Sequence, residues 1–197
     1  MIYMPNLILV TGNGRNIGKT TLVEALIKLL SSQTKVYGLK VVKLGESKGS
    51  FHGDHSNLSN GRRGNQIGDL LYDTKTRLVD SIIEENMECP SKDTARMIIA
   101  GAEKAWFIQN SETELEEVIN LWIRQSEPDG IVVCESAILR SCLIPGVMVA
   151  IKQSAPWENL KDWGLPFTLA NVVIEKSVEM PDYIRWAEKI INQFDHL

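Results

Sequence analysis

Hydrophobic residues fall into short runs separated by amphipathic stretches along the first part of this chain. Residues 6–11 form a continuous apolar run closed by glycines, which predicts a strand buried on both faces of a parallel sheet. Leu22, Leu26 and Leu29 recur at helical spacing within residues 19–32, and residues 36–42 are apolar again. Strand, helix and strand within about 35 residues are typical of a right-handed crossover unit. The pattern predicts an α/β fold.

The same alternation continues toward the C-terminal end. Four more apolar runs predict strands at residues 105–109, 130–135, 147–151 and 169–174. Residues 67–87 fit neither the helical nor the strand period; a helix is the prediction and a hairpin is the alternative. The chain is expected to form one domain, residues 1–197, with a mostly parallel sheet of about six strands flanked by helices.

Start signals predict three further helices. Ser91 offers an N-cap, and Ser111 with Glu114 forms a capping box. Pro181 is placed to open a final helix on which Ile184 is among the residues expected to face inward.

Composition and charge narrow the class of protein. The 197 residues include 21 Lys and Arg against 25 Asp and Glu, a net charge of −4, so binding to nucleic acid is not expected. The longest apolar runs are strand-sized, so no membrane span is expected. The N-terminus lacks a basic signal region, which favours a cytoplasmic location, and Cys89, Cys134 and Cys142 are expected to be free thiols.

Residues 10–21, VTGNGRNIGKTT, have the composition and context of a phosphate-binding loop between a strand and a helix. In such a loop, backbone N–H groups and the helix N-terminus point at phosphate oxygens. Lys19 would reach the β- and γ-phosphates of ATP or GTP, and Thr20 would give its hydroxyl to Mg²⁺. The residues expected to contact nucleotide are Gly12, Asn13, Gly14, Arg15, Asn16, Ile17, Gly18, Lys19, Thr20 and Thr21.

One position departs from the usual loop pattern. Asn13 stands where a glycine normally lies five residues before Gly18. Asparagine tolerates left-handed backbone conformations better than most residues, so we still expect the loop to form.

Charged residues at the ends of two predicted strands are further candidates. Glu135 ends an apolar strand, where open α/β sheets bind ligands, and is expected to hold Mg²⁺ or else to cap a neighbouring helix. Lys40 lies near the end of the second predicted strand, and it either lies beside the γ-phosphate or a substrate as a catalytic residue, like Lys19, or is a solvated lysine. Together with Thr20, these residues make up most of the expected magnesium and catalytic site.

A long polar stretch, residues 43–66, is rich in Gly, Ser, Asn and His and is a candidate lid or substrate loop. Asp54 within it is a candidate outer carboxylate of the Mg²⁺ site. His52 and His55 either bind a metal, coordinate a substrate or relay a proton, or are solvated loop residues. Trp157 and Trp163 would cover a substrate or a partner in a homodimer, or would pack locally.

These segments resemble the P-loop ATPases and GTPases that include dethiobiotin synthetase and the molybdopterin-guanine dinucleotide biosynthesis adaptor. The loop is similar to that of the synthetase, and residues 36–40, VYGLK, resemble the second strand of both families. Residues 92–102, KDTARMIIAGA, are similar to a segment of the adaptor, and residues 129–135, DGIVVCE, resemble a strand of both families that ends in Val-Glu-Gly. However, Ser136 and the pair Ile138–Leu139 replace glycines, which disfavours the dethiobiotin reaction.

The resemblance implies a three-layer P-loop NTPase fold and a Mg²⁺-dependent protein that binds and slowly hydrolyses ATP or GTP. It also implies an accessory role in molybdenum cofactor biosynthesis, with a small molecule or cofactor as second ligand. One alternative is an ATP-dependent synthetase acting on a small acid. Another is a nucleotide-gated switch that binds a partner. The choice of base is open, because no NKxD motif is present.

Overall fold

The computed structural model describes residues 1–44, 78, 81–153, 164–176 and 182–194. The strands are β1 (Ile2–Gly12), β2 (Val36–Lys43), β3 (Ile82–Glu84), β4 (Lys104–Asn110), β5 (Ile131–Ser136), β6 (Leu143–Gln153) and β7 (Val172–Lys176). The helices are α1 (Lys19–Leu30), α3 (Asp93–Ile99), α4 (Leu115–Ser126), the short 3-10 turn η1 (Leu139–Ser141), α5 (Gly164–Leu169) and α6 (Tyr183–Phe194).

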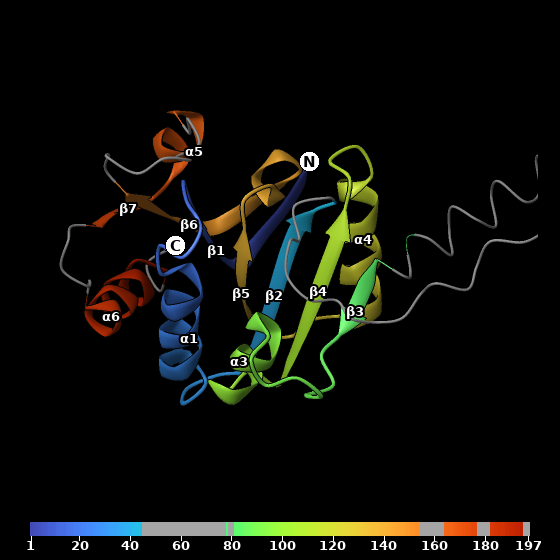
Figure 1. Cartoon of the computed structure of the whole chain (residues 1–197), viewed down its shortest axis with the longest axis horizontal. Helices are drawn as coiled ribbons and strands as arrows, with labels where there is room; N and C mark the ends of the chain where they lie inside the picture. Colours follow the sequence, from blue (N-terminus) through green and yellow to red (C-terminus); the bar gives the residue numbers. More distant parts are fainter. Residues whose placement is uncertain (45–77, 79–80, 154–163, 177–181, 195–197) are drawn as a thin grey trace, which may run out of the picture.

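The strands form one seven-stranded sheet in the order β3-β4-β2-β5-β1-β6-β7 (Figure 1). Each neighbouring pair is parallel except β3 with β4, which is antiparallel. β5 lies between β1 and β2, so the carboxyl ends of these three strands meet at one edge of the sheet. Loops that follow β1, β2 and β5 are thereby brought together.

Helices cover both faces of the sheet and enclose two hydrophobic cores. One core is built from α1 and α6 with the facing residues of the strands, such as Leu26, Val133 and Ile190. The other lies beneath α4 and includes Trp106 and Trp122, whose rings meet edge to face at 5.7 Å. The expected three-layer α/β fold with a mostly parallel sheet is confirmed.

The sheet has one strand more than the six that the sequence located. We expected about six, and the described residues form seven. The additional strand is β3, three residues within the 67–87 segment that fitted neither period. A strand this short carries too few residues to show an alternating pattern, which is why the sequence did not reveal it. Of the predicted helix there, Leu78 is helical and residues 67–77 lie outside the described part.

Several predicted element starts are also wrong. The N-cap of α3 is Lys92 rather than Ser91, and α4 begins at Leu115 after an N-cap residue that makes no side-chain capping bond. The expected capping box does not form because a turn separates Ser111 from the helix, and its hydroxyl contacts Thr113 at 3.0 Å. On α6, Ile184 is 55% exposed rather than inward.

The sixth predicted strand begins later than expected. Residues 169–174 were predicted as a strand, but Leu169 ends α5 and β7 begins at Val172.

Candidate functional site

The loop between β1 and α1 joins the end of a buried strand to the start of a helix, as the sequence predicted (Figure 1). Two of its glycines are required by the geometry. A Cβ at Gly12 would lie 2.5 Å from the side chain of Ile17, and Gly18 has φ 97°, in the left-handed region. Lys19 folds back over the loop and donates to the carbonyl oxygen of Gly14 at 2.5 Å.

Asn13 supports the loop in a different way from the one we expected. Asn13 is not among the residues with positive φ; Asn16, at φ 55°, is. The side-chain amide of Asn13 is buried and pairs with the end of β6, donating to the carbonyl oxygen of Gln153 at 3.1 Å and accepting from its N–H at 2.9 Å. Asn13 therefore fastens the loop to the sheet.

Lys40 and Glu135 are neighbours because of strand register. The parallel pairing of β2 with β5 sets these two residues directly opposite each other, 95 positions apart in the chain. The Nζ atom of Lys40 lies 2.5 Å from Oε1 of Glu135, and the two side chains are 14% and 5% exposed. Burial lowers the pKa of Lys40, but the carboxylates of Glu135 and Asp93 outweigh it, so the pKa stands above its usual value.

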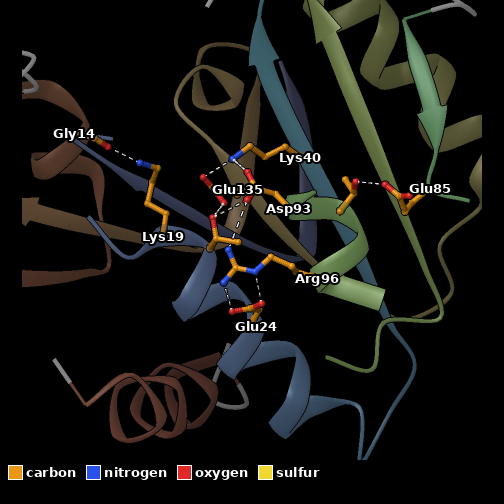
Figure 2. Close-up of polar contacts among 10 residues, drawn as sticks. Gly14, Lys19, Glu24, Lys40, Glu85, Asp93, Arg96 and Glu135 are labelled. Atoms are coloured by element: carbon orange, nitrogen blue, oxygen red, sulfur yellow. Dashed lines mark hydrogen bonds and ion pairs between the residues drawn. The ribbon is translucent and has the colours of Figure 1, made fainter. Parts of the chain in front are cut away.

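Asp93, at the start of α3, completes this cluster, although we did not identify it as a site residue from the sequence. Figure 2 shows Lys40, Asp93 and Glu135 pointing toward one another from β2, α3 and β5. Oδ2 of Asp93 is 2.9 Å from Nζ of Lys40. The hydroxyl of Thr20, on the first turn of α1, donates to Oε2 of Glu135 at 2.8 Å and lies 3.3 Å from Oδ1 of Asp93.

The short helix α3 is tied in place on both sides. Arg96 donates from Nε and a terminal nitrogen to the two carboxylate oxygens of Glu24 on α1, both at 2.7 Å. The hydroxyl of Thr94 donates to the carboxylate of Glu85, which follows β3. The bidentate pair of Arg96 with Glu24 fixes orientation as well as distance. The contacts hold α3 so that Asp93 faces Thr20 and Lys40.

No protein-family model and no curated protein sequence matches the chain. Among solved structures, the chain is similar to a plasmid partition protein from Borrelia burgdorferi, at 13% sequence identity and a TM-score of 0.37 over 98% of this chain and 99% of that one. A similarity of this size transfers neither activity nor partners. None of these comparisons supports a role in molybdenum cofactor biosynthesis or the binding of GTP in particular.

The donor atoms of this cluster fit Mg²⁺. A hydroxyl oxygen and two carboxylates, from Thr20, Asp93 and Glu135, converge at the phosphate loop. Mg²⁺ is typically held by one or two carboxylates together with phosphate oxygens and waters. Among the described residues there is no group of three or more His, Cys, Asp or Glu that could hold a metal by itself. This donor set suits a metal that arrives with phosphates.

The segment after β5 is held by hydrogen bonds to the Ser136 side chain. The hydroxyl oxygen of Ser136 accepts hydrogen bonds from the N–H groups of Ile138 at 3.1 Å and Leu139 at 3.0 Å. Leu139 itself is fully buried. These two N–H groups are thus engaged within the chain, and the expectation about the dethiobiotin reaction stays a prediction.

Some predictions fall outside the described residues. They include Asp54, His52, His55, Trp157, Trp163 and most of the 43–66 stretch. The three cysteines are free thiols, as expected. Within the described part of the chain, no helix has both the length and the apolar character needed to cross a membrane.

Proposed function

We propose that this protein binds a nucleoside triphosphate together with Mg²⁺ at the carboxyl ends of β1, β2 and β5, and hydrolyses it slowly. The observation that carries the proposal is the convergence of Thr20, Glu135 and Asp93 beside a phosphate loop that ends in Lys19. A loop of this kind binds phosphates through backbone N–H groups, and the oxygen donors beside it are those Mg²⁺ prefers.

Each residue has a role that follows from its position. Residues 12–21 surround the phosphates, with Lys19 contacting them after it leaves the Gly14 carbonyl oxygen. Thr20, Glu135 and Asp93 would hold Mg²⁺, which neutralises charge on the phosphoryl group when bound. The sequence offered Asp54 as an outer carboxylate of the metal site, and it lies outside the described residues. The proposal uses Asp93, because it contacts Thr20 directly and shares the Lys40 ammonium group with Glu135.

Lys40 has two positions in this proposal. In the ligand-free protein its ammonium group is bound by the carboxylates of Glu135 and Asp93, where the metal would lie. A lysine so close to the phosphate loop is also placed to contact the γ-phosphate when it leaves these carboxylates. Lys40 therefore competes with Mg²⁺ before binding and stabilises developing negative charge afterwards.

The proposal stops at nucleotide binding and slow hydrolysis. We leave molybdenum cofactor biosynthesis out of it, because no family model or curated protein of that kind matches the chain. A small-acid synthetase is disfavoured because the N–H groups of Ile138 and Leu139 are bonded to Ser136. ATP and GTP are the two candidate nucleotides, and the binding experiment decides between them.

The test is a thermal-unfolding and calorimetry panel with ATP, GTP, ADP and GDP, each with and without Mg²⁺. A ligand at about one hundred times its Kd stabilises a protein by about 2.7 kcal/mol, which is readily measured. Lys19→Ala should abolish most of the triphosphate binding, whereas Lys28→Ala, on the exposed side of the same helix, should not. Equal triphosphate affinity in the two variants would refute the assignment of the loop.

A second variant separates the metal from the phosphates. Glu135→Gln keeps the shape of the side chain and its bond to Thr20 but loses the charge that Mg²⁺ requires. Triphosphate binding without metal should persist, and its enhancement by Mg²⁺ should shrink. Glu117→Gln, an exposed residue of α4, is the matched control. An unchanged Mg²⁺ enhancement in Glu135→Gln would place the metal elsewhere.

A further inference from the structure

Two residues from the C-terminal part of the chain donate hydrogen bonds to backbone carbonyl oxygens of the phosphate loop. Tyr183, the first residue of α6, donates its hydroxyl hydrogen to the carbonyl oxygen of Ile17 at 3.3 Å. Lys176, the last residue of β7, donates from Nζ to the carbonyl oxygen of Asn16 at 3.4 Å. Two consecutive carbonyl oxygens of the loop are therefore held by side chains of the β7–α6 region.

The loop adopts backbone conformations that need such support. Asn16 has φ 55° and Gly18 has φ 97°, both in the left-handed region. For a residue with a side chain this conformation is unfavourable, and it persists where surrounding contacts hold it. Successive backbone N–H groups in alternating right- and left-handed conformations form an anion-binding concavity. Donors that bind the carbonyl oxygens leave those N–H groups for a phosphate.

Tyr183 also limits where the loop can move. Its side chain is buried, and a Cβ added at Gly18 would lie 1.7 Å from its hydroxyl oxygen. Such contact shows that the backbone at Gly18 passes directly against the tyrosine. The helix that carries Tyr183 packs alongside α1, the helix that follows the loop (Figure 1).

We propose that Tyr183 and Lys176 are positioning residues that preorganise the phosphate loop by holding the carbonyl oxygens of Asn16 and Ile17. This inference deepens the proposed function and rests on it, because it states how the phosphate site is kept ready before ligand arrives. A site that is already ordered spends less binding energy on ordering. Neither residue is proposed to touch the nucleotide.

The experiment compares Tyr183→Phe, Lys176→Met and the double variant with the unmodified protein. Tyr3→Phe, at an exposed position on β1, and Lys152→Met, at an exposed position on β6, are the matched controls. The first readout is hydrogen exchange of residues 14–19 without ligand. The second is the Kd of inorganic tripolyphosphate with Mg²⁺, measured where each variant is fully folded. Exchange of the core strands reports global stability separately.

We expect both single variants to exchange faster in the loop and to bind tripolyphosphate about fivefold more weakly, which is about 1 kcal/mol at 1.4 kcal/mol per tenfold. Core exchange should match that of the controls. Unchanged loop exchange in both variants would overturn the preorganising role, as would faster exchange with an unchanged Kd. If the unmodified protein does not bind tripolyphosphate, the proposed function fails, while loop exchange still decides whether the two side chains order the loop.

Discussion

Replacing Lys40 by methionine tests whether this lysine holds the position of the metal in the free protein. Methionine keeps a long apolar side chain in place of the buried stem but removes the ammonium group that contacts Glu135 at 2.5 Å and Asp93 at 2.9 Å. Glu135 would then lack its ammonium partner, and Asp93 would keep only Arg96, whose guanidinium lies 4.0 Å from its carboxylate. We expect the variant to be less stable than the unmodified protein without metal, and to bind Mg²⁺ more tightly.

The size of the effect follows from the two contacts. A hydrogen bond to a charged group contributes about 1.5–3 kcal/mol. Mg²⁺ must displace at least one such contact to reach the carboxylates of the unmodified protein. Because about 1.4 kcal/mol corresponds to a factor of ten, Lys40→Met should bind Mg²⁺ about tenfold more tightly without nucleotide. The same variant should be less stable than the unmodified protein without metal, since the buried carboxylate of Glu135 loses its ammonium partner.

The assay is calorimetric titration with Mg²⁺, repeated with Mn²⁺, together with thermal unfolding at several metal concentrations. Lys43→Met is the matched control: it lies on the same strand, and its contact with Glu112 at 3.0 Å joins two side chains that are 43% and 51% exposed. Metal should stabilise Lys40→Met more than either the control or the unmodified protein. Equal or weaker metal binding by Lys40→Met would refute the competition between Lys40 and Mg²⁺.

Three further predictions concern Asn13, Tyr37 and the cysteines. Asn13→Ala removes both bonds to Gln153 and should lower the free energy of unfolding by about 1–3 kcal/mol in urea titrations; an unchanged midpoint would contradict its role in fastening the loop. A hydrogen bond to Asp129 raises the pKa of Tyr37 from 10.0 to about 12. The stability that this hydrogen bond contributes should therefore be complete below pH 10 and lost as the pH rises toward 12. Tyr37→Phe should lack this pH-dependent loss of stability. The contact with Ser91 lowers the pKa of Cys89. Burial raises the pKa of Cys142 to about 11 and that of Cys134 well above its usual value. A thiol reagent should therefore label Cys89 first and the other two cysteines only after unfolding. Rapid labelling that persists in Cys89→Ser would count against this order.

Local patterns were sufficient to predict the glycine-rich loop and the strand and helix that flank it, β1 and α1. The apolar run, the glycines and the leucine spacing all lie within about 30 residues, so no distant contact was needed to interpret them. Lys40 and Glu135 could also be proposed from their places near the ends of predicted strands, although β2 continues to Lys43. That they touch depends on β2 pairing with β5 in one register, which no local pattern reveals.

Asp93 and Asn13 show where local reasoning failed. Asp93 joins the site because Arg96 fastens α3 to Glu24 of α1, 72 positions away in the chain, while Thr94 bonds the nearer Glu85. The available signal was the resemblance of residues 92–102 to a known segment, which marked the region but not the residue. Asn13 was expected to supply the left-handed turn, but its amide is engaged by β6, so Asn16 adopts that conformation instead.

The place of β5 in the sheet has a consequence for how the chain folds. β1 and β2 both pair with β5 rather than with each other, although β5 follows them by about 90 residues or more. Until β5 inserts, the first half of the chain has two strands whose facing edges lack a partner, a state that favours aggregation during synthesis. Glu135 enters on that same strand. The contacts of Lys40 and Thr20 with Glu135 can therefore form only when the sheet closes, so an N-terminal fragment ending at α4 should bind Mg²⁺ weakly even if it collapses.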